Sequence, residues 1–220
     1  MNRILASLAL CLVSILPAHA VNPRVEMDTN YGKVTFELYP DKAPVTVANF
    51  LNYVNSGFYE GTLFHRVVNR FIVQGGAYTE DLTPKPTLAP IVNEAGNGLL
   101  NEPGTLAMAR GHDVNSATSQ FYVNLDSNKF LNHYKNDPDY YGYCVFGRVV
   151  KGMDVLKKIA QTPTGAADPL KEDVPLTPVV IEKVAVLPPE LEPAPKLKSK
   201  PKGKSNGKTK HKPRPHLAGT

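Results

Sequence analysis

The chain has 220 residues, 42% of them apolar, which is enough for one domain with a substantial hydrophobic core. Its body contains no apolar run of transmembrane length, so no membrane-spanning helix is expected there. The formal net charge of +5 is unevenly distributed, because residues 196–220 hold nine Lys or Arg and no acid, whereas residues 21–195 hold 15 basic and 20 acidic residues.

The first twenty residues predict a cleaved secretory signal. Arg3 supplies a positive start, residues 4–16 are apolar, and residues 18–20 place small side chains where a signal peptidase cleaves. A lipoprotein signal at Cys11 is the alternative, but Leu10 is bulky where that processing needs a small residue. We therefore expect residues 1–20 to be removed and the protein to be periplasmic, with secretion as the alternative.

Cysteine usage provides no crosslink for the exported chain. Cleavage after residue 20 removes Cys11 and leaves Cys144 as the remaining cysteine. An intrachain disulfide is then impossible in spite of the oxidising compartment. Cys144 lies in an apolar strand pattern and is predicted to be a buried core residue.

A hairpin followed by a helix is predicted at the start of the exported domain. Apolar and polar residues alternate on both sides of the turn Asn30-Tyr31-Gly32. Asp41 is a candidate helix cap, Pro44 suits the first turn, and Gly57 ends the helix. The apolar residues of this helix fall on one face, and they are Val47, Phe50, Leu51 and Val54.

The segment FHRVVNRFIVQGG, which begins at Phe64, carries most of the information about function. Its β-branched residues predict two strand pieces that break near Asn69-Arg70. Because residues two apart in a strand share a face, Phe64 should point the same way as Arg66, and Ile72 the same way as Gln74. The pair Gly75-Gly76 then allows a turn or a close approach to a ligand.

This combination presents a guanidinium and a carboxamide over an apolar floor, with no nucleophile in the run. It favours recognition of an uncharged polar group beside an apolar ring, and a peptidyl-proline fits that description. The remaining chain predicts short strands separated by Gly, Asn and Pro, a second helix at about residues 153–160, and a last strand at residues 179–186. A closed antiparallel barrel with a helix over each mouth suits this pattern.

Four ordered motifs carry a resemblance to a known family. They are the FHRV…QGG segment, GTLAMAR at residues 104–110, SATSQFYVNL at residues 116–125 and YCVFGRVVKGMDVL at residues 143–156. The chain thereby resembles the cyclophilin family of peptidyl-prolyl cis-trans isomerases over about residues 24–187, with spacing like that of the bacterial exported members.

The resemblance implies a mainly β isomerase domain at residues 21–187, built as a closed eight-stranded barrel capped by two helices. It implies a monomer without a cofactor or metal, which rotates X-Pro bonds of unfolded or extended polypeptides and assists the folding of exported proteins. Arg66 would be the catalytic donor, and Gln74 would bind the substrate backbone and help to orient Arg66. The implied substrate-binding residues are Phe71, Ile72, Tyr122 and Leu131 in the proline pocket, Ala109, Arg110 and Gln120 along the groove, and Phe130 and Tyr143 at its rim.

The sequence departs from the common family pattern at four of these positions. Phe130 stands where many eukaryotic members have tryptophan, so we expect cyclosporin to inhibit weakly. Tyr143 replaces a frequent histidine, Tyr122 a phenylalanine and Ile72 a methionine. The arginine, phenylalanine and glutamine positions are intact, which favours isomerase activity.

Other readings of these residues stay open. Phe64 and Phe121 are predicted to be core, and His65 fits either the core or the site. The protein is alternatively a binding module or chaperone for which turnover is incidental. Serine hydrolysis through Ser119, His112 and Asp126 is disfavoured because no Gly-x-Ser-x-Gly elbow is present, and the histidines His65, His112 and His133 lack metal-ligand spacing.

From about residue 188 the composition changes. Large apolar residues nearly vanish and lysines alternate through residues 196–204, so a disordered tail is predicted for residues 188–220. The tail is either a solubilising, self-repelling segment or a non-specific contact for polyanions. No aromatic residue is interleaved with these lysines, which argues against base stacking.

Overall fold

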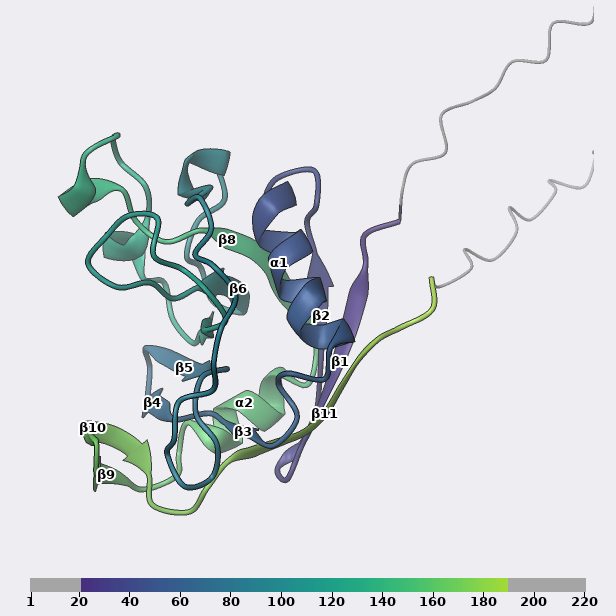
Figure 1. Ribbon diagram of the computed structural model, residues 1–220, viewed down its shortest axis with the longest axis vertical. Coiled ribbons are helices and arrows are strands. Elements are labelled where there is room, and N and C mark those ends of the chain that lie inside the picture. The colour runs from purple at the N-terminus through teal and green to yellow at the C-terminus, as the bar shows by residue number, and fades with distance from the viewer. Residues whose placement is uncertain (1–20, 190–220) are drawn as a thin grey trace, which may run out of the picture. The chain divides into compact units, whose positions relative to one another are not determined.

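The computed structural model describes residues 21–189, and this part of the chain is built mainly of β-strands (Figure 1). The predicted signal and most of the predicted tail lie outside the described residues. The strands are β1 (Arg24–Thr29), β2 (Gly32–Leu38), β3 (Thr62–Leu63), β4 (Arg66–Val68), β5 (Ile72–Gly75), β6 (Thr105–Met108), β7 (Phe121–Asn124), β8 (Val145–Lys151), β9 (Thr164–Ala167), β10 (Leu170–Pro175) and β11 (Val180–Val186). The helices are α1 (Pro44–Asn55) and α2 (Met153–Ile159), with short 3-10 turns at Ala95–Asn97, Lys129–Leu131 and Pro138–Tyr140.

Nine strands form one antiparallel sheet in the order β3-β11-β1-β2-β8-β6-β7-β5-β4, and β9 with β10 forms a separate hairpin. The mainly β fold with two helices is as predicted. Among the described residues no helix is long and apolar enough to cross a membrane.

The expected closed eight-stranded barrel is not confirmed, because the curled sheet has two ends, β3 and β4, with no hydrogen-bond ladder between them in residues 21–189. The physical reason lies at Phe64 and His65. The Phe64 amide still donates to the Val179 carbonyl beside β11, whereas Arg66 already pairs with Gln74 of β5. The chain itself therefore joins the two edges of the sheet, and it is divided there into two short strands.

Helix α1 begins two residues later than its predicted cap would place it. Asp41 does not cap it; the residue before the helix is Ala43, which makes no side-chain cap. Instead, the Glu94 carboxylate accepts hydrogen bonds from the backbone N–H groups of Val45 and Thr46, at 3.1 and 2.8 Å. A carboxylate at a helix N-terminus satisfies free donors and complements the dipole, and this one comes from a distant loop.

The main core lies on the inner face of the sheet, where both helices contribute apolar side chains. Phe50 of α1 packs against Phe121 and Phe146, with ring centroids 5.6 and 5.2 Å apart, and Leu156 and Ile159 of α2 are fully buried in the same core. Phe64, Phe121 and Cys144 are buried in this core as predicted.

The outer face of the sheet carries a second, smaller apolar cluster. In β5 and β7, Val73 and Val123 enter the main core, while their neighbours Ile72 and Tyr122 belong to the outer cluster. Successive side chains of a strand point to opposite faces, so these strands are buried on both sides. Loops must therefore cover the outer face, and it is there that the predicted site residues gather.

Two local expectations from the sequence need revision. Phe64 does not share a face with Arg66, since Phe64 lies in the core and in no strand, so strict alternation begins only at Arg66. The glycine pair serves the protein's own packing. A side chain at Gly75 would meet the Leu63 carbonyl at 2.9 Å, and Gly76 has φ +87°, so it turns the chain as predicted.

Candidate functional site

Three neighbouring strands bring the predicted catalytic side chains into one row. Arg66 of β4 is directly opposite Gln74 of β5, and Gln74 is directly opposite Tyr122 of β7. Directly opposite residues in an antiparallel sheet share a face with Cβ atoms about 5 Å apart. The row therefore places a cation, an amide and an aromatic ring side by side on the outer face of the sheet.

An apolar pocket continues this row. Ile72, Tyr122 and Val145 are buried in the outer cluster together with Ala107. Partly buried side chains from the loops pack against them, namely Phe71, Leu99, Ala109, Leu131 and Tyr143. The four residues predicted for the proline pocket, Phe71, Ile72, Tyr122 and Leu131, are thus brought together.

Phe71 of this pocket lies against Phe130 at the open rim. Their rings stack with centroids 5.7 Å apart and an interplanar angle of 25°. Phe130 is 70% exposed and Phe71 is only half-buried. The Arg66 guanidinium carbon lies 5.9 Å from the centre of the Phe71 ring, so a positive charge stands beside an exposed aromatic wall.

A polar groove extends from Gln74 along the other side of the row. Gln74, Ala109, Arg110 and Gln120 line a pocket of about 180 Å³ with Gly111, Ser116 and Thr118. The Gln74 amide nitrogen donates to the Gln120 side-chain oxygen at 2.9 Å. Arg110 is fixed by donation from Nε to the Gly142 carbonyl at 3.1 Å and lies over the Tyr143 ring at 4.8 Å. Ala109, Arg110 and Gln120 are the predicted groove residues, Gln74 joins them there, and Ala109 also packs against the apolar pocket.

Asn101, a residue that no sequence motif indicated, supports the pocket through hydrogen bonds to its lining. Its buried side-chain oxygen accepts hydrogen bonds from the Tyr122 hydroxyl at 2.8 Å and from Asn124 Nδ2 at 3.1 Å. Its side-chain nitrogen donates to the Leu131 carbonyl at 3.1 Å. Burial raises the pKa of Tyr122 well above its usual range, so this hydroxyl remains a donor. An asparagine in a loop segment is typical of a turn, so no local signal pointed to this role.

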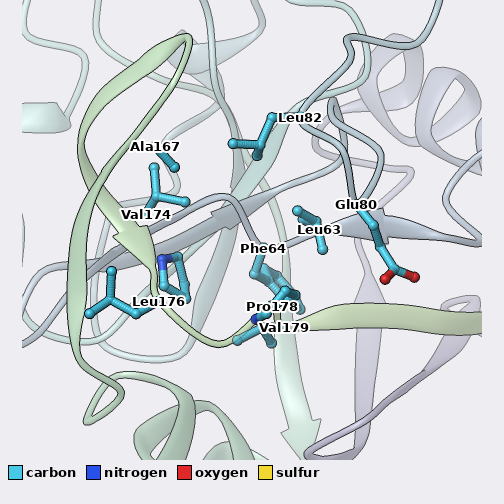
Figure 2. A pocket seen from close by; sticks show the side chains of 10 residues that line it. Leu63, Phe64, Glu80, Leu82, Ala167, Val174, Leu176, Pro178 and Val179 are labelled. Atoms are coloured by element: carbon cyan, nitrogen blue, oxygen red, sulfur yellow. The ribbon is translucent and has the colours of Figure 1, made fainter.

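A second apolar pocket, of about 210 Å³, shares no lining residue with this row (Figure 2). Leu63, Phe64 and Val179 line it from the sheet side, and Val174 and Pro175 of β10 line it from the hairpin. It contains no residue predicted for the site, and its one charged lining residue is Glu80. We therefore place the candidate site at the Arg66 row and not in the more apolar pocket.

His65, which the sequence left open, is a buried group. Its ring packs edge-on against Tyr78 with centroids 4.7 Å apart, and its Nδ1 has no hydrogen-bond partner among the described residues. Burial lowers the pKa of His65 to about 4. The neutral form is thus the native one, which makes His65 a packing residue next to Arg66.

We expect this histidine to make stability pH-dependent. A group whose pKa is about 4 when folded and near its ordinary 6.5 when unfolded stabilises the fold fully above pH 6.5 and loses this contribution as the pH falls towards 4. At about 1.4 kcal/mol per pKa unit, the free energy of unfolding should fall by on the order of 3 kcal/mol between pH 7 and pH 4. Urea melts of the wild type and of His65→Gln at several pH values would isolate the contribution of His65. If the free energy of unfolding depended on pH equally in the two proteins, this prediction would be wrong.

The described residues are not arranged for serine hydrolysis, thiol chemistry or metal binding. Ser119 is fully buried and donates its hydroxyl to the Gly76 carbonyl at 2.7 Å, while His112 and Asp126 lie on exposed loops. Burial raises the pKa of the Cys144 thiol to about 11, which keeps it protonated. In residues 21–189 no group of three or more His, Cys, Asp or Glu is placed to hold a metal ion.

The proteins to which this chain is similar are peptidyl-prolyl cis-trans isomerases. A family model described as cyclophilin type peptidyl-prolyl cis-trans isomerase/CLD matches residues 24–186. The chain is 51% identical over 163 residues to peptidyl-prolyl cis-trans isomerase cyp18 of Streptomyces antibioticus. This alignment covers 74% of this chain and 98% of that protein. It is 48% identical over 162 residues to peptidyl-prolyl cis-trans isomerase B of Escherichia coli K12, and this alignment covers 74% of this chain and 98% of that protein.

A third relative and a solved structure agree with these. Peptidyl-prolyl cis-trans isomerase A of Dickeya dadantii is 46% identical over 190 residues, 84% of this chain and 98% of that protein. The crystal structure of a cyclophilin type peptidyl-prolyl cis-trans isomerase from Cryptosporidium parvum, obtained in the presence of the dipeptide Ala-Pro, superposes with a TM-score of 0.63 at 27% identity, covering 75% of this chain and 99% of that one.

Proposed function

Since this chain belongs to the cyclophilin-type peptidyl-prolyl cis-trans isomerase family and is such an isomerase, we propose that the Arg66 row is its catalytic centre. The observation that carries this proposal is the position of the Arg66 guanidinium, 5.9 Å from the ring of Phe71 at the open rim of an apolar pocket. A proline ring seated in the pocket would bring its nitrogen close to this cation.

The chemistry of the reaction fits such a site. The C–N bond has partial double-bond character, and its rotation has a barrier of about 18–20 kcal/mol. In the twisted transition state the nitrogen lone pair is localised, and a fixed donor that meets it stabilises that state more than the planar ground state. Arginine is suited to this because it is always charged and offers several donors. No covalent bond is broken, and the site needs no nucleophile.

The remaining residues divide into pocket and groove. Phe71, Ile72, Tyr122 and Leu131 hold the proline ring, while Phe130 and Tyr143 form the rim. Gln74, Ala109, Arg110 and Gln120 bind the peptide backbone along the polar groove. We propose an Ala-Pro-containing peptide as the substrate class, and the relative solved in the presence of Ala-Pro supports this choice.

A peptide titration tests the assignment of the site. We expect a short Ala-Pro peptide, added to 15N-labelled protein, to shift the amide resonances of Phe71, Tyr122 and Gln120. Exchange spectroscopy on the same sample should show accelerated cis-trans exchange of the peptide. The resonances of Leu82 and Val179 at the separate apolar pocket serve as the control. Shifts confined to that pocket would move the site away from Arg66.

As the family resemblance implies, we propose that the protein is a monomer. We further propose that the clients are exported polypeptides and that the protein works in the periplasm. The basis is the signal-like pattern of residues 1–20, which lie outside the described residues. Assisting the folding of exported proteins then follows from the chemistry, because X-Pro exchange takes roughly tens to hundreds of seconds without a catalyst. Fractionation of cells that express the whole chain tests the location, and retention in the cytoplasm would contradict it.

The basic C-terminal segment should be separable from catalysis. Deleting residues 190–220 removes nine basic residues and no apolar anchor, so we expect unchanged isomerase activity and loss of retention on heparin at low salt. Contacts through exposed charges are screened beyond about 8 Å at physiological ionic strength, so retention should also vanish as salt is raised.

A charge variant is the matched control for this deletion. Replacing the five lysines of residues 196–204 by glutamine keeps the length of the chain but removes the run of charge. It should weaken heparin retention in the same direction as the deletion. Retention that survives the deletion, or a large loss of activity on a short peptide, would show that the isomerase domain and the basic segment act together.

A further inference from the structure

The group expected to orient the Arg66 guanidinium has another partner. Gln74 lies opposite Arg66 in the sheet, but its amide nitrogen donates to Gln120. Within residues 21–189, the ion pair of Arg66 is with Asp173, and the closest atoms are Arg66 Nη2 and Asp173 Oδ2 at 3.2 Å. Asp173 belongs to the β9-β10 hairpin, which is not part of the main sheet.

A shift of register in this hairpin lies where Asp173 turns towards Arg66. The pairing of β10 with β9 is Leu170 with Ala167 and then Val174 with Gly165, so β10 carries extra residues between these two pairs. Asp173 adopts φ +63° there. Bulges of this kind redirect side chains and are common beside active sites, and aspartate and asparagine are among the few non-glycine residues that accept the left-handed conformation.

The next residue brings the hairpin to the wall of a cavity. Val174 is buried and lines the apolar pocket with Leu63 and Phe64, as Figure 2 shows. Phe64 is two residues before Arg66 in the chain. The segment that carries Phe64 and Arg66 and the segment that carries Asp173 and Val174 therefore border the same cavity, and β10 lies beside β4 in the fold.

We propose that Asp173 is a positioning residue for Arg66, which holds the guanidinium beside Phe71 while leaving other N–H donors for the substrate. This inference rests on the proposed role of Arg66. The side chains of Arg66 and Asp173 are 37% and 27% exposed, and a solvent-exposed pair of this kind adds little to stability. Its effect is instead to reduce the set of orientations that the long arginine side chain adopts before the peptide binds.

The first test is Asp173→Asn, which removes the charge but keeps the shape and the tolerance for φ +63°. We expect kcat to fall roughly three- to tenfold with KM little changed, because Arg66 spends less time in the productive orientation. Glu172→Gln is the matched control, since it makes the same charge change at the adjacent exposed residue. An increase in kcat, or an equal effect of the control, would overturn the proposal.

The second test separates Asp173 from Arg66. In an Arg66→Ala background, Asp173→Asn should have no further effect on kcat, because residues that act through one another are not additive. A further drop there would show that Asp173 acts by itself and would refute the positioning role. Guanidinium NMR gives a readout independent of activity, since rotation of the Arg66 Nη groups should become faster in Asp173→Asn. Unchanged rotation would refute the restraint even if the assignment of Arg66 to catalysis failed.

Discussion

Arg66→Ala should lower kcat/KM on a proline peptide by about 10²–10³ while the fold is retained. This is the usual scale for the loss of one preorganised donor at a site of developing charge. The fold should survive because Arg66 is partly exposed on the outer face of β4 and its ion pair with Asp173 is not buried. Exchange spectroscopy on an Ala-Pro peptide measures the activity, and a urea melt checks the fold.

Arg148→Ala is the matched control for this prediction. Arg148 is also a strand arginine paired to a carboxylate, with Nη2 3.1 Å from Glu37 Oε2, but it lies on β8 outside the predicted site. It should leave kcat/KM unchanged. Activity of Arg66→Ala within threefold of the wild type would remove Arg66 from the mechanism, whatever the control shows.

The elements that local pattern determines were predictable. The break near Arg70 is confirmed, since β4 ends at Val68, β5 begins at Ile72, and Arg70 has φ +60°. The shared face of Ile72 and Gln74 is confirmed too, because strand alternation depends only on neighbours two residues apart. Both helices were found because their apolar residues repeat at helical spacing.

Contacts between distant segments were not predictable in the same way. The cap of α1 comes from Glu94, about fifty residues after the helix begins, so the local signal of Asp41 was misleading. Asn101 and Asp173 were missed for the same reason. Each contacts a side chain that is distant in the sequence, Tyr122 and Arg66 respectively. Single asparagines and aspartates are also common in turns, so neither residue stood out. The open edge of the sheet depends on where the chain passes from β3, which pairs with β11, to β4, which pairs with β5, and strand periodicity says nothing about that.

The grouping of the site residues came from the family resemblance and not from periodicity. The structure brings Arg66, Phe71 and Tyr122 together, and Arg110 and Gln120 line the adjoining groove. Their roles in substrate binding stay predictions. The partner expected for Arg66 changes, because Gln74 bonds Gln120 and the carboxylate of Asp173 is beside the guanidinium.

A comparison of two phenylalanines tests the division between core and site. Phe64→Ala should lower the free energy of unfolding by about 3–5 kcal/mol, the range for emptying a buried aromatic site. Phe64 is only 1% exposed and packs edge-on against Phe121 with centroids 5.9 Å apart. Denaturant melts measure this loss. Peptide affinity of the folded fraction should change little, because Phe64 has no place in the pocket of the outer face.

Phe71→Ala should show the opposite balance. Phe71 is half-buried and stacks on the exposed ring of Phe130, so its removal exposes little new core and leaves a cavity open to solvent. It should cost less stability than Phe64→Ala but weaken peptide binding more, because the apolar wall beside the Arg66 guanidinium is lost. Peptide titrations of both variants decide the matter. If Phe64→Ala weakened binding more, or Phe71→Ala cost more stability, the proline pocket would not lie on the outer face of the sheet.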